Sequence, residues 1–111
     1  MAYDEELAGR IRAVIARRPD LTEKKMFGGL AFLIGGNMAV SASGQGAMLL
    51  RVDPEESDRL IESGEASLAV MQGRAMPGWL RVPPEHLRTS HQLERWVERG
   101  VSFAGSLPPK R

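Results

Sequence analysis

The amino-acid sequence predicts an α+β fold, a two-layer domain in which a five-stranded, mainly antiparallel sheet has helices on one face. Its 111 residues are the usual size of one domain, and 42% hydrophobic with 26% charged residues is an ordinary globular composition. Helix-like and strand-like periodicities follow each other in the order α-β-β-β-α-β-β-α. Short glycine turns join the first three strands, and such strands are antiparallel because parallel ones need long crossovers. We therefore expect residues 1–111 to form one domain.

The first helix is expected over residues 4–18, because its apolar side chains recur at i, i+4, i+7 and i+8 and so share one face. Acidic residues begin the helix and basic residues end it, as the helix dipole favours. Pro19 prevents its continuation. The apolar face consists of Leu7, Ile11, Val14 and Ile15.

The second helix has the clearest start in the chain. Asp53 supplies an N-cap acceptor, Pro54 suits the first helical position, and Glu56 has the spacing of a capping-box glutamate. Gly64 is expected to end this helix.

The last helix is expected to begin at Thr89 or Ser90, since Thr89 and Gln92 also have capping-box spacing. Its apolar residues form one stripe, which predicts that Trp96 is buried. The stripe consists of Leu93, Trp96, Val97, Gly100, Val101 and Ala104.

Strand-like segments alternate with turn residues in the rest of the chain. Gly35–Gly36 forms a two-residue hairpin turn, because glycine enters the required φ > 0 region freely. After this turn, Met38, Val40 and Ala42 alternate with small residues and are expected to face the core. Residues 73–78 are interpreted as a connection, although it is long for a tight hairpin. The five strands are expected over residues 30–34, 37–43, 47–52, 68–72 and 79–82.

Charge is distributed unevenly although the net charge is only +1. Residues 26–52 contain a single charged side chain, that of Arg51, and are expected to be the most buried stretch. Residues 53–72 hold six acidic side chains and one basic one, whereas residues 73–111 hold seven basic and three acidic ones. The pI of about 8.2 lies below the value of about 9 that free nucleic-acid-binding domains usually exceed. Charge alone therefore leaves nucleic-acid binding open without favouring it.

The chain contains no cysteine, which excludes thiol catalysis, disulfides, cysteine-ligated zinc and iron–sulfur clusters and fits a reducing compartment. The longest apolar stretch, Leu30–Ile34, is far shorter than the ~20 residues that span a bilayer. The acidic amino terminus differs from the basic start of a signal peptide. We expect a cytoplasmic protein that is soluble and makes no use of a membrane.

Residues 22–29 are the most unusual segment, because paired lysines, an apolar pair and paired glycines follow each other directly. A Walker loop carries its lysine after the glycines, whereas Lys24 and Lys25 precede them here. The segment also departs from the stacking strand of RNA-recognition domains, since Gly29 replaces its second aromatic residue. The simpler interpretation is a sharp bend that brings Phe27 into the core.

No catalytic, metal-binding or cofactor-binding constellation is predicted. His86 and His91 are five residues apart with a helix start between them, whereas metal-binding histidines on one helix are commonly four apart. Ser43 lacks the flanking pattern of a nucleophile elbow. The carboxylates of the second helix are typical of a solvated face. We therefore expect a protein that is not an enzyme and carries no cofactor.

Three ordered motifs resemble a known family. Residues 22–32 read Thr-Glu-Lys-Lys-Met-Phe-Gly-Gly-Leu-Ala-Phe, residues 36–39 read Gly-Asn-Met-Ala, and residues 71–79 read Met-x-Gly-Arg-x-Met-x-Gly-Trp. With the closing helix around Trp96 and Val97, the chain resembles the amino-terminal domain of the TfoX/Sxy competence regulators. The resemblance implies a bacterial cytoplasmic domain and, for full-length members, transcription regulation of competence genes as a co-activator beside a DNA-bound regulator. Those regulators add a second, carboxy-terminal domain, whereas this sequence suggests a stand-alone domain.

Two functional hypotheses follow from different surfaces. The first is binding of an unidentified protein partner through the segment around Lys24 and the segment that ends at Trp79, because the least core-like residues gather there. It involves Lys24, Lys25, Met26, Phe27, Gly28, Gly29, Arg74 and Trp79. The alternative is direct nucleic-acid binding through the basic carboxy-terminal segment, with Arg88, Arg95, Arg99, Lys110 and Arg111. The chain is expected to be a monomer or a homodimer.

Overall fold

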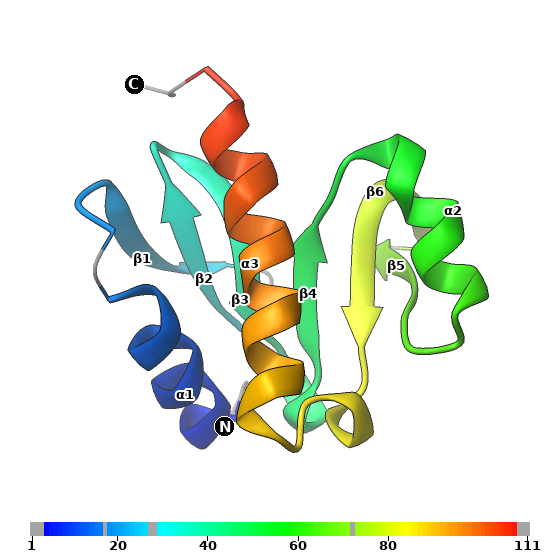
Figure 1. The fold of residues 1–111 in the computed structure, drawn as a ribbon, viewed down its shortest axis with the longest axis horizontal. Coiled ribbons are helices and arrows are strands. Elements are labelled where there is room, and N and C mark those ends of the chain that lie inside the picture. Colours follow the sequence, from blue (N-terminus) through cyan, green and yellow to red (C-terminus); the bar gives the residue numbers. More distant parts are fainter. Residues whose placement is uncertain (1–3, 17, 27–28, 72, 109–111) are drawn as a thin grey trace.

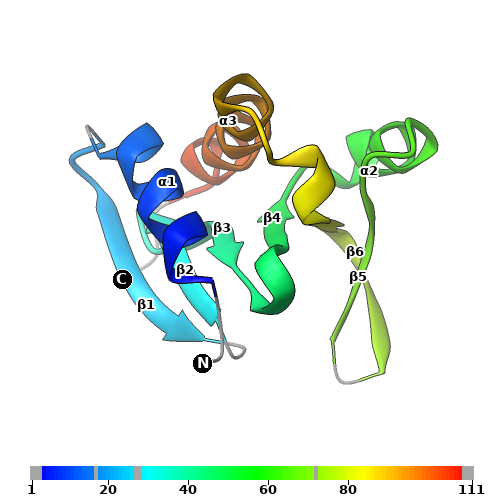
Figure 2. The same cartoon turned by 90° about the horizontal axis from the view of Figure 1, so that it is seen from below.

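The computed structural model describes residues 4–16, 18–26, 29–71 and 73–108, without the side chains of Met26, Gln45 and Met71. Within these residues, three helices cover one face of a six-stranded sheet. Figures 1 and 2 show this two-layer arrangement. The helices are α1 (Glu5–Ile15), α2 (Pro54–Glu62) and α3 (Ser90–Ser106). The strands are β1 (Leu21–Met26), β2 (Gly29–Ile34), β3 (Asn37–Ala42), β4 (Met48–Arg51), β5 (Ser67–Met71) and β6 (Arg74–Val82). Two 3-10 turns, η1 (Gly44–Gly46) and η2 (Pro84–His86), complete the order.

The strands lie in the order β1-β2-β3-β4-β6-β5, and each neighbouring pair is antiparallel. The predicted fold class is therefore confirmed, but the prediction of five strands is wrong. The missed strand is β1, which carries charged side chains in its middle and was interpreted as a bend. It lies at the edge of the sheet, where a strand needs no continuous apolar pattern.

The helix boundaries follow the predicted capping residues. The Asp53 side chain accepts a hydrogen bond from the backbone N–H of Glu55 at 2.9 Å, and Thr89 and Gln92 form the predicted capping box. The first helix is shorter than predicted and ends at Ile15 instead of residue 18. Gly64 adopts a φ of 85° after the second helix, as its C-terminal role requires.

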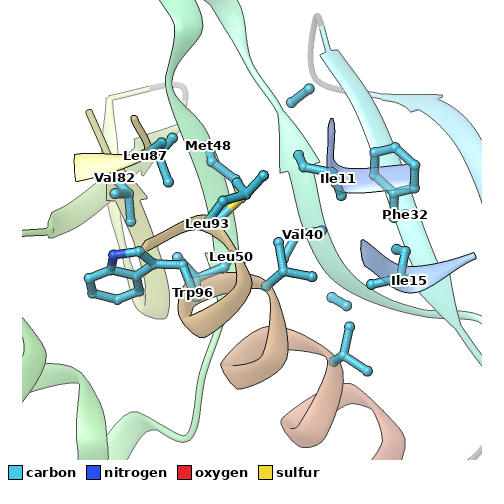
Figure 3. Packing of buried hydrophobic residues seen from close by; sticks show 14 of the residues in the cluster. Ile11, Ile15, Phe32, Val40, Met48, Leu50, Val82, Leu87, Leu93 and Trp96 are labelled. Atoms are coloured by element: carbon cyan, nitrogen blue, oxygen red, sulfur yellow. The ribbon is translucent and has the colours of Figure 1, made fainter. Parts of the chain in front are cut away.

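The larger core lies between the helices and the sheet. Figure 3 shows Ile11 of α1 and Trp96 of α3 among strand residues such as Phe32, Val40 and Leu50. Phe32, Val40 and Leu50 are completely buried, and Trp96 is 3% exposed, so the predicted burial of this tryptophan is confirmed.

Met38 does not join this core as predicted. A register shift between Phe32 and Leu33 pairs Phe32 with Val40 but Leu33 with Met38, so Ala39 is an extra residue in β3. The bulge reverses the alternation at this point, and Met38 belongs to a second apolar cluster on the opposite face of the sheet.

Candidate interaction surface

The face of the sheet opposite the three helices carries its own apolar cluster. We call it the helix-free face, and it is the lower side of the sheet in Figure 2. The cluster contains strand residues only, and it crosses the sheet from β2 to β5. It consists of buried Ala31, Met38, Leu49 and Ala69, with partly buried Leu33 and Trp79 packed against them.

Cross-strand pairing assigns three basic residues to the helix-free face. Lys24 lies directly opposite Ala31, and Arg81 lies opposite Leu49. Arg51 lies opposite Trp79. Residues that pair directly across strands share a face of the sheet, so these three cations surround the apolar cluster.

Arg74 is the fourth basic residue of this face. It pairs with Met71, which lies two positions after Ala69 in the same strand and so shares its face. Arg74 is exposed.

The two remaining charged strand residues belong to the other face. Glu23 pairs with Phe32 and Lys25 pairs with Leu30, which are both members of the core beneath the helices. Among the described strand residues, every charge on the helix-free face is therefore positive. Lys24, Arg74 and Arg81 take part in no ion pair within the described residues.

Arg51 contacts the rings of Trp79 and of Phe103 in α3, so its guanidinium reaches the helix side of the sheet at the end of β4. The Arg51 guanidinium carbon lies 5.4 Å from the centre of the Trp79 ring and 5.6 Å from the centre of the Phe103 ring of α3. Both distances are typical of cation–π contacts. The partner-binding prediction includes Trp79, whose ring is partly buried and already in contact with Arg51.

The segment from Arg74 to Trp79 is a strand with a bulge and not the predicted connecting loop. Val70 pairs with Ala75, whereas Leu68 pairs with Leu80, so β6 contains several extra residues between these pairs. The reason that sequence reasoning failed here is that a proline and a glycine interrupt the strand pattern without ending the strand.

Gly78 holds this bulge in place. Its φ is 83°, and its carbonyl accepts a hydrogen bond from the backbone N–H of Val52 at 2.8 Å. A Cβ atom at this position would lie 3.2 Å from Pro54 Cγ and from the Val52 carbonyl oxygen. The glycine of the motif is therefore required by the junction between β6 and the start of α2.

The other predicted partner-binding segment, residues 24–29, lies only partly on the helix-free face. Lys24 and Lys25 are both exposed on β1, but only Lys24 lies on the helix-free face. Gly29 approaches the Ala42 carbonyl so closely that a Cβ atom would collide with it, which indicates a structural role. Phe27, Gly28 and the side chain of Met26 lie outside the described residues.

One predicted segment lies on and beside the edge strand β1, and the other lies on β6, next to the opposite edge strand β5. Lys24 and Arg81 occupy one cross-strand row, with Ala31, Ser41 and Leu49 between them. Four strand spacings of about 4.8 Å give a separation of about 19 Å between the ends of this row.

The sequence analysis did not identify Arg51 and Arg81 as residues of this surface. Arg51 stands two positions after Leu49 and Arg81 two positions after Trp79, and both Leu49 and Trp79 belong to the cluster.

The basic carboxy-terminal segment forms no uniform basic surface in its described part. Arg99 stacks on Trp96 at 4.6 Å, and Arg95 and Arg99 line a groove of about 530 Å³ between α2 and α3. Acidic side chains line the same groove, so its charges are mixed. They are Asp53, Glu56 and Glu98. Arg88 is exposed before α3, and Lys110 and Arg111 lie outside the described residues.

Among the titratable groups in the described part of the chain, Glu23 has a clearly changed pKa, and it lies away from the helix-free face. The side chain of Arg12 donates two hydrogen bonds to Glu23, at 2.7 and 2.8 Å, and these lower the pKa of the Glu23 carboxyl from its usual value of 4.5.

No group of three or more potential metal ligands occurs among the described residues, and His86 and His91 lie in η2 and α3. None of the described helices is long and apolar enough to cross a membrane.

The architecture defines a small two-layer α+β domain with one helix-covered face and one face that no described helix covers. The family model of the TfoX N-terminal domain matches residues 13–104, and the chain belongs to this family. The match includes β1, the Gly29 position and the bulged strand β6, which carry the motifs noted in the sequence. A comparison with curated proteins found no significant match.

Proposed function

We propose that this chain is a non-enzymatic interaction domain that binds a protein partner through its helix-free face. The observation that carries the proposal is the uniform sign of that face, where Lys24, Arg74 and Arg81 lie around an apolar cluster, with Arg51 at its border, and no described acidic strand residue accompanies them. Uniform charge favours a partner of opposite charge and speeds its association. The partner surface is therefore acidic, and its apolar side chains meet the partly buried Leu33 and Trp79, because the other members of the cluster are buried.

The proposal includes a regulatory role in the cytoplasm. Membership of the TfoX N-terminal domain family supports this role, since the full-length TfoX/Sxy regulators act on competence genes. In this role the domain acts by contact with another regulator and not by chemistry of its own.

Lys24 and Lys25 are adjacent lysines on opposite faces of β1, so substitutions on one face can be compared with matched substitutions elsewhere. A triple variant, Lys24→Ala with Arg74→Ala and Arg81→Ala, removes three charges from the helix-free face. The control variant, Lys25→Ala with Arg88→Ala and Arg95→Ala, removes the same charge elsewhere. Circular dichroism melting establishes that both variants are folded.

The readout is affinity capture from the native cell lysate, with and without nuclease. The proposal expects that capture of a specific protein falls about tenfold or more in the first variant and is unchanged in the control. Equal capture by both variants contradicts the assignment of the surface.

Nucleic-acid binding by the carboxy-terminal segment is the competing proposal. It predicts that nuclease abolishes capture, that the control variant with Arg88→Ala and Arg95→Ala is the weaker one, and that binding falls steeply with salt. The mixed charges around Arg95 and Arg99 favour the protein partner over this alternative.

A further inference from the structure

The two edge strands of the sheet differ in how they oppose further pairing. β1 exposes Glu23, Lys24 and Lys25, and charged side chains protect an edge strand from other strands. β5 contains only Ser, Leu, Ala, Val and Met, and it pairs with β6 alone among the described strands. Val70 of β5 is 65% exposed, the most exposed large hydrophobic side chain among the described residues. The edge at β5 is therefore uncharged, apolar and open.

We infer that β5 pairs with the β5 strand of a second copy of this chain, and that the two sheets join into one continuous sheet. Unpaired backbone N–H and C=O groups along an edge strand are a template for another strand. The bulge between β5 and β6 places its extra residues in β6, so β5 continues unbroken as a pairing edge.

The sequence of β5 is complementary to itself in an antiparallel arrangement centred on Ala69. In this register Ser67 lies opposite the partner's Met71, and Leu68 lies opposite the partner's Val70. The exposed Val70 side chain then meets an apolar side chain in place of water.

Charges on either side of β5 support a second copy as the occupant. Glu65 precedes the strand, and Arg74 follows it across the hairpin turn. The two-fold arrangement brings Glu65 to the hairpin end of the other copy, within reach of the partner's Arg74. The two-fold symmetry forms this pair of opposite charges twice, whereas an unrelated strand would not carry charges at the matching positions.

The acidic helix α2 packs mainly on β6, and Figures 1 and 2 show it at the outer side of the sheet, beside the β5 edge. Repulsion between the two copies of this helix weakens the association, and physiological salt screens such charges over about 8 Å. Because only a short strand is paired, the dimer is weak and depends on protein concentration.

Sedimentation velocity of the full chain from about 10 µM to about 1 mM tests the inference. We expect the sedimentation coefficient to rise with concentration from that of a monomer to that of a dimer. The variant Val70→Lys places a charge against the partner's Leu68 and should weaken association about tenfold or more. Thr22→Lys places the same side chain on the exposed edge strand β1 and should leave association unchanged.

A charge exchange tests the register. Glu65→Arg alone and Arg74→Glu alone should each weaken the dimer several-fold, and the two substitutions together should restore it. A wild-type monomer at all concentrations overturns the inference, as does a dimer that Val70→Lys leaves intact. If the charge exchange restores nothing, the register centred on Ala69 is wrong. Arg74 belongs to both proposals, so Val70→Lys separates them: it should weaken the dimer and leave partner capture by Lys24 and Arg81 unchanged.

Discussion

The two faces of the sheet contain apolar side chains of different size and in different surroundings. Beneath the helices, large side chains such as Phe32, Leu50 and Leu80 are completely buried. On the helix-free face the buried cluster is smaller, with Ala31 and Ala69 among its members and basic residues around it. The face beneath the helices therefore supplies most of the folding free energy, whereas residues around the smaller cluster can serve recognition without loss of the fold.

The strongest test of this difference uses two adjacent residues of β2. Phe32 is completely buried beneath the helices, whereas Leu33 is partly buried on the helix-free face. Phe32→Ala should lower the free energy of unfolding by about 3–5 kcal/mol, and Leu33→Ala by about 1–2 kcal/mol. Urea denaturation followed by circular dichroism measures both. Equal losses would show that the helix-free face is as much a part of the core as the other.

The next test concerns how α3 sits on the sheet. A Cβ atom at Gly100 would lie 2.5 Å from the Ala39 carbonyl oxygen and 2.8 Å from Val40 Cγ1. Gly100→Ala must therefore displace the helix, and should destabilise the protein by about 1–3 kcal/mol. Gly9→Ala, in α1, meets nothing within 4 Å and should stabilise the protein by about 0.5–1 kcal/mol. The shifts in melting temperature of the two variants should have opposite signs.

On the helix-free face, substitution of Arg51 should have a smaller effect on stability. Arg51→Met keeps the length of the side chain but removes the charge beside Trp79 and Phe103. The expected cost is about 0.5–1 kcal/mol, measured by urea denaturation. A loss of several kcal/mol would mean that Arg51 belongs to the core.

The smallest expected effect is the pH dependence of the ion pair between Arg12 and Glu23. Because the hydrogen bonds from Arg12 lower the pKa of Glu23 in the folded state, the pair stabilises the protein above the usual pKa of 4.5. This contribution is lost as the pH falls through the lowered pKa. Both side chains are partly exposed, so it amounts to a few tenths of a kcal/mol.

The measurement compares the wild type with Glu23→Gln in urea titrations at pH 7 and about pH 2.5. The variant should be the less stable protein at pH 7, and the difference should shrink at low pH. A difference that grows on acidification would contradict the sign of the pKa change.

Local patterns were sufficient for much of the fold. The stripe in α3 predicted the burial of Trp96, and the Gly35–Gly36 turn and the caps at Asp53 and Thr89 lie where the sequence placed them. These features depend on interactions within a few residues. The edge strand β1 was missed because its central charges, on Glu23, Lys24 and Lys25, give no burial signal.

The candidate site was less predictable, because its residues meet across strands. Lys24 and Arg74 were identified from unusual segments, but nothing local shows that Lys24 shares a face with Arg81 while Lys25 does not. The bulge at Ala39 likewise transfers Met38 to the helix-free face against its own alternation.

The sequence by itself determined the helices, their caps and the apolar strands, because backbone preferences and side-chain periodicity act over short distances. The tertiary structure decided the strand order, the register and therefore the gathering of four basic residues on one face. Register depends on hydrogen bonds between strands distant in the chain, and a shift of one residue moves a side chain to the other face. The same non-local pairing leaves β5 as the uncharged edge of the sheet.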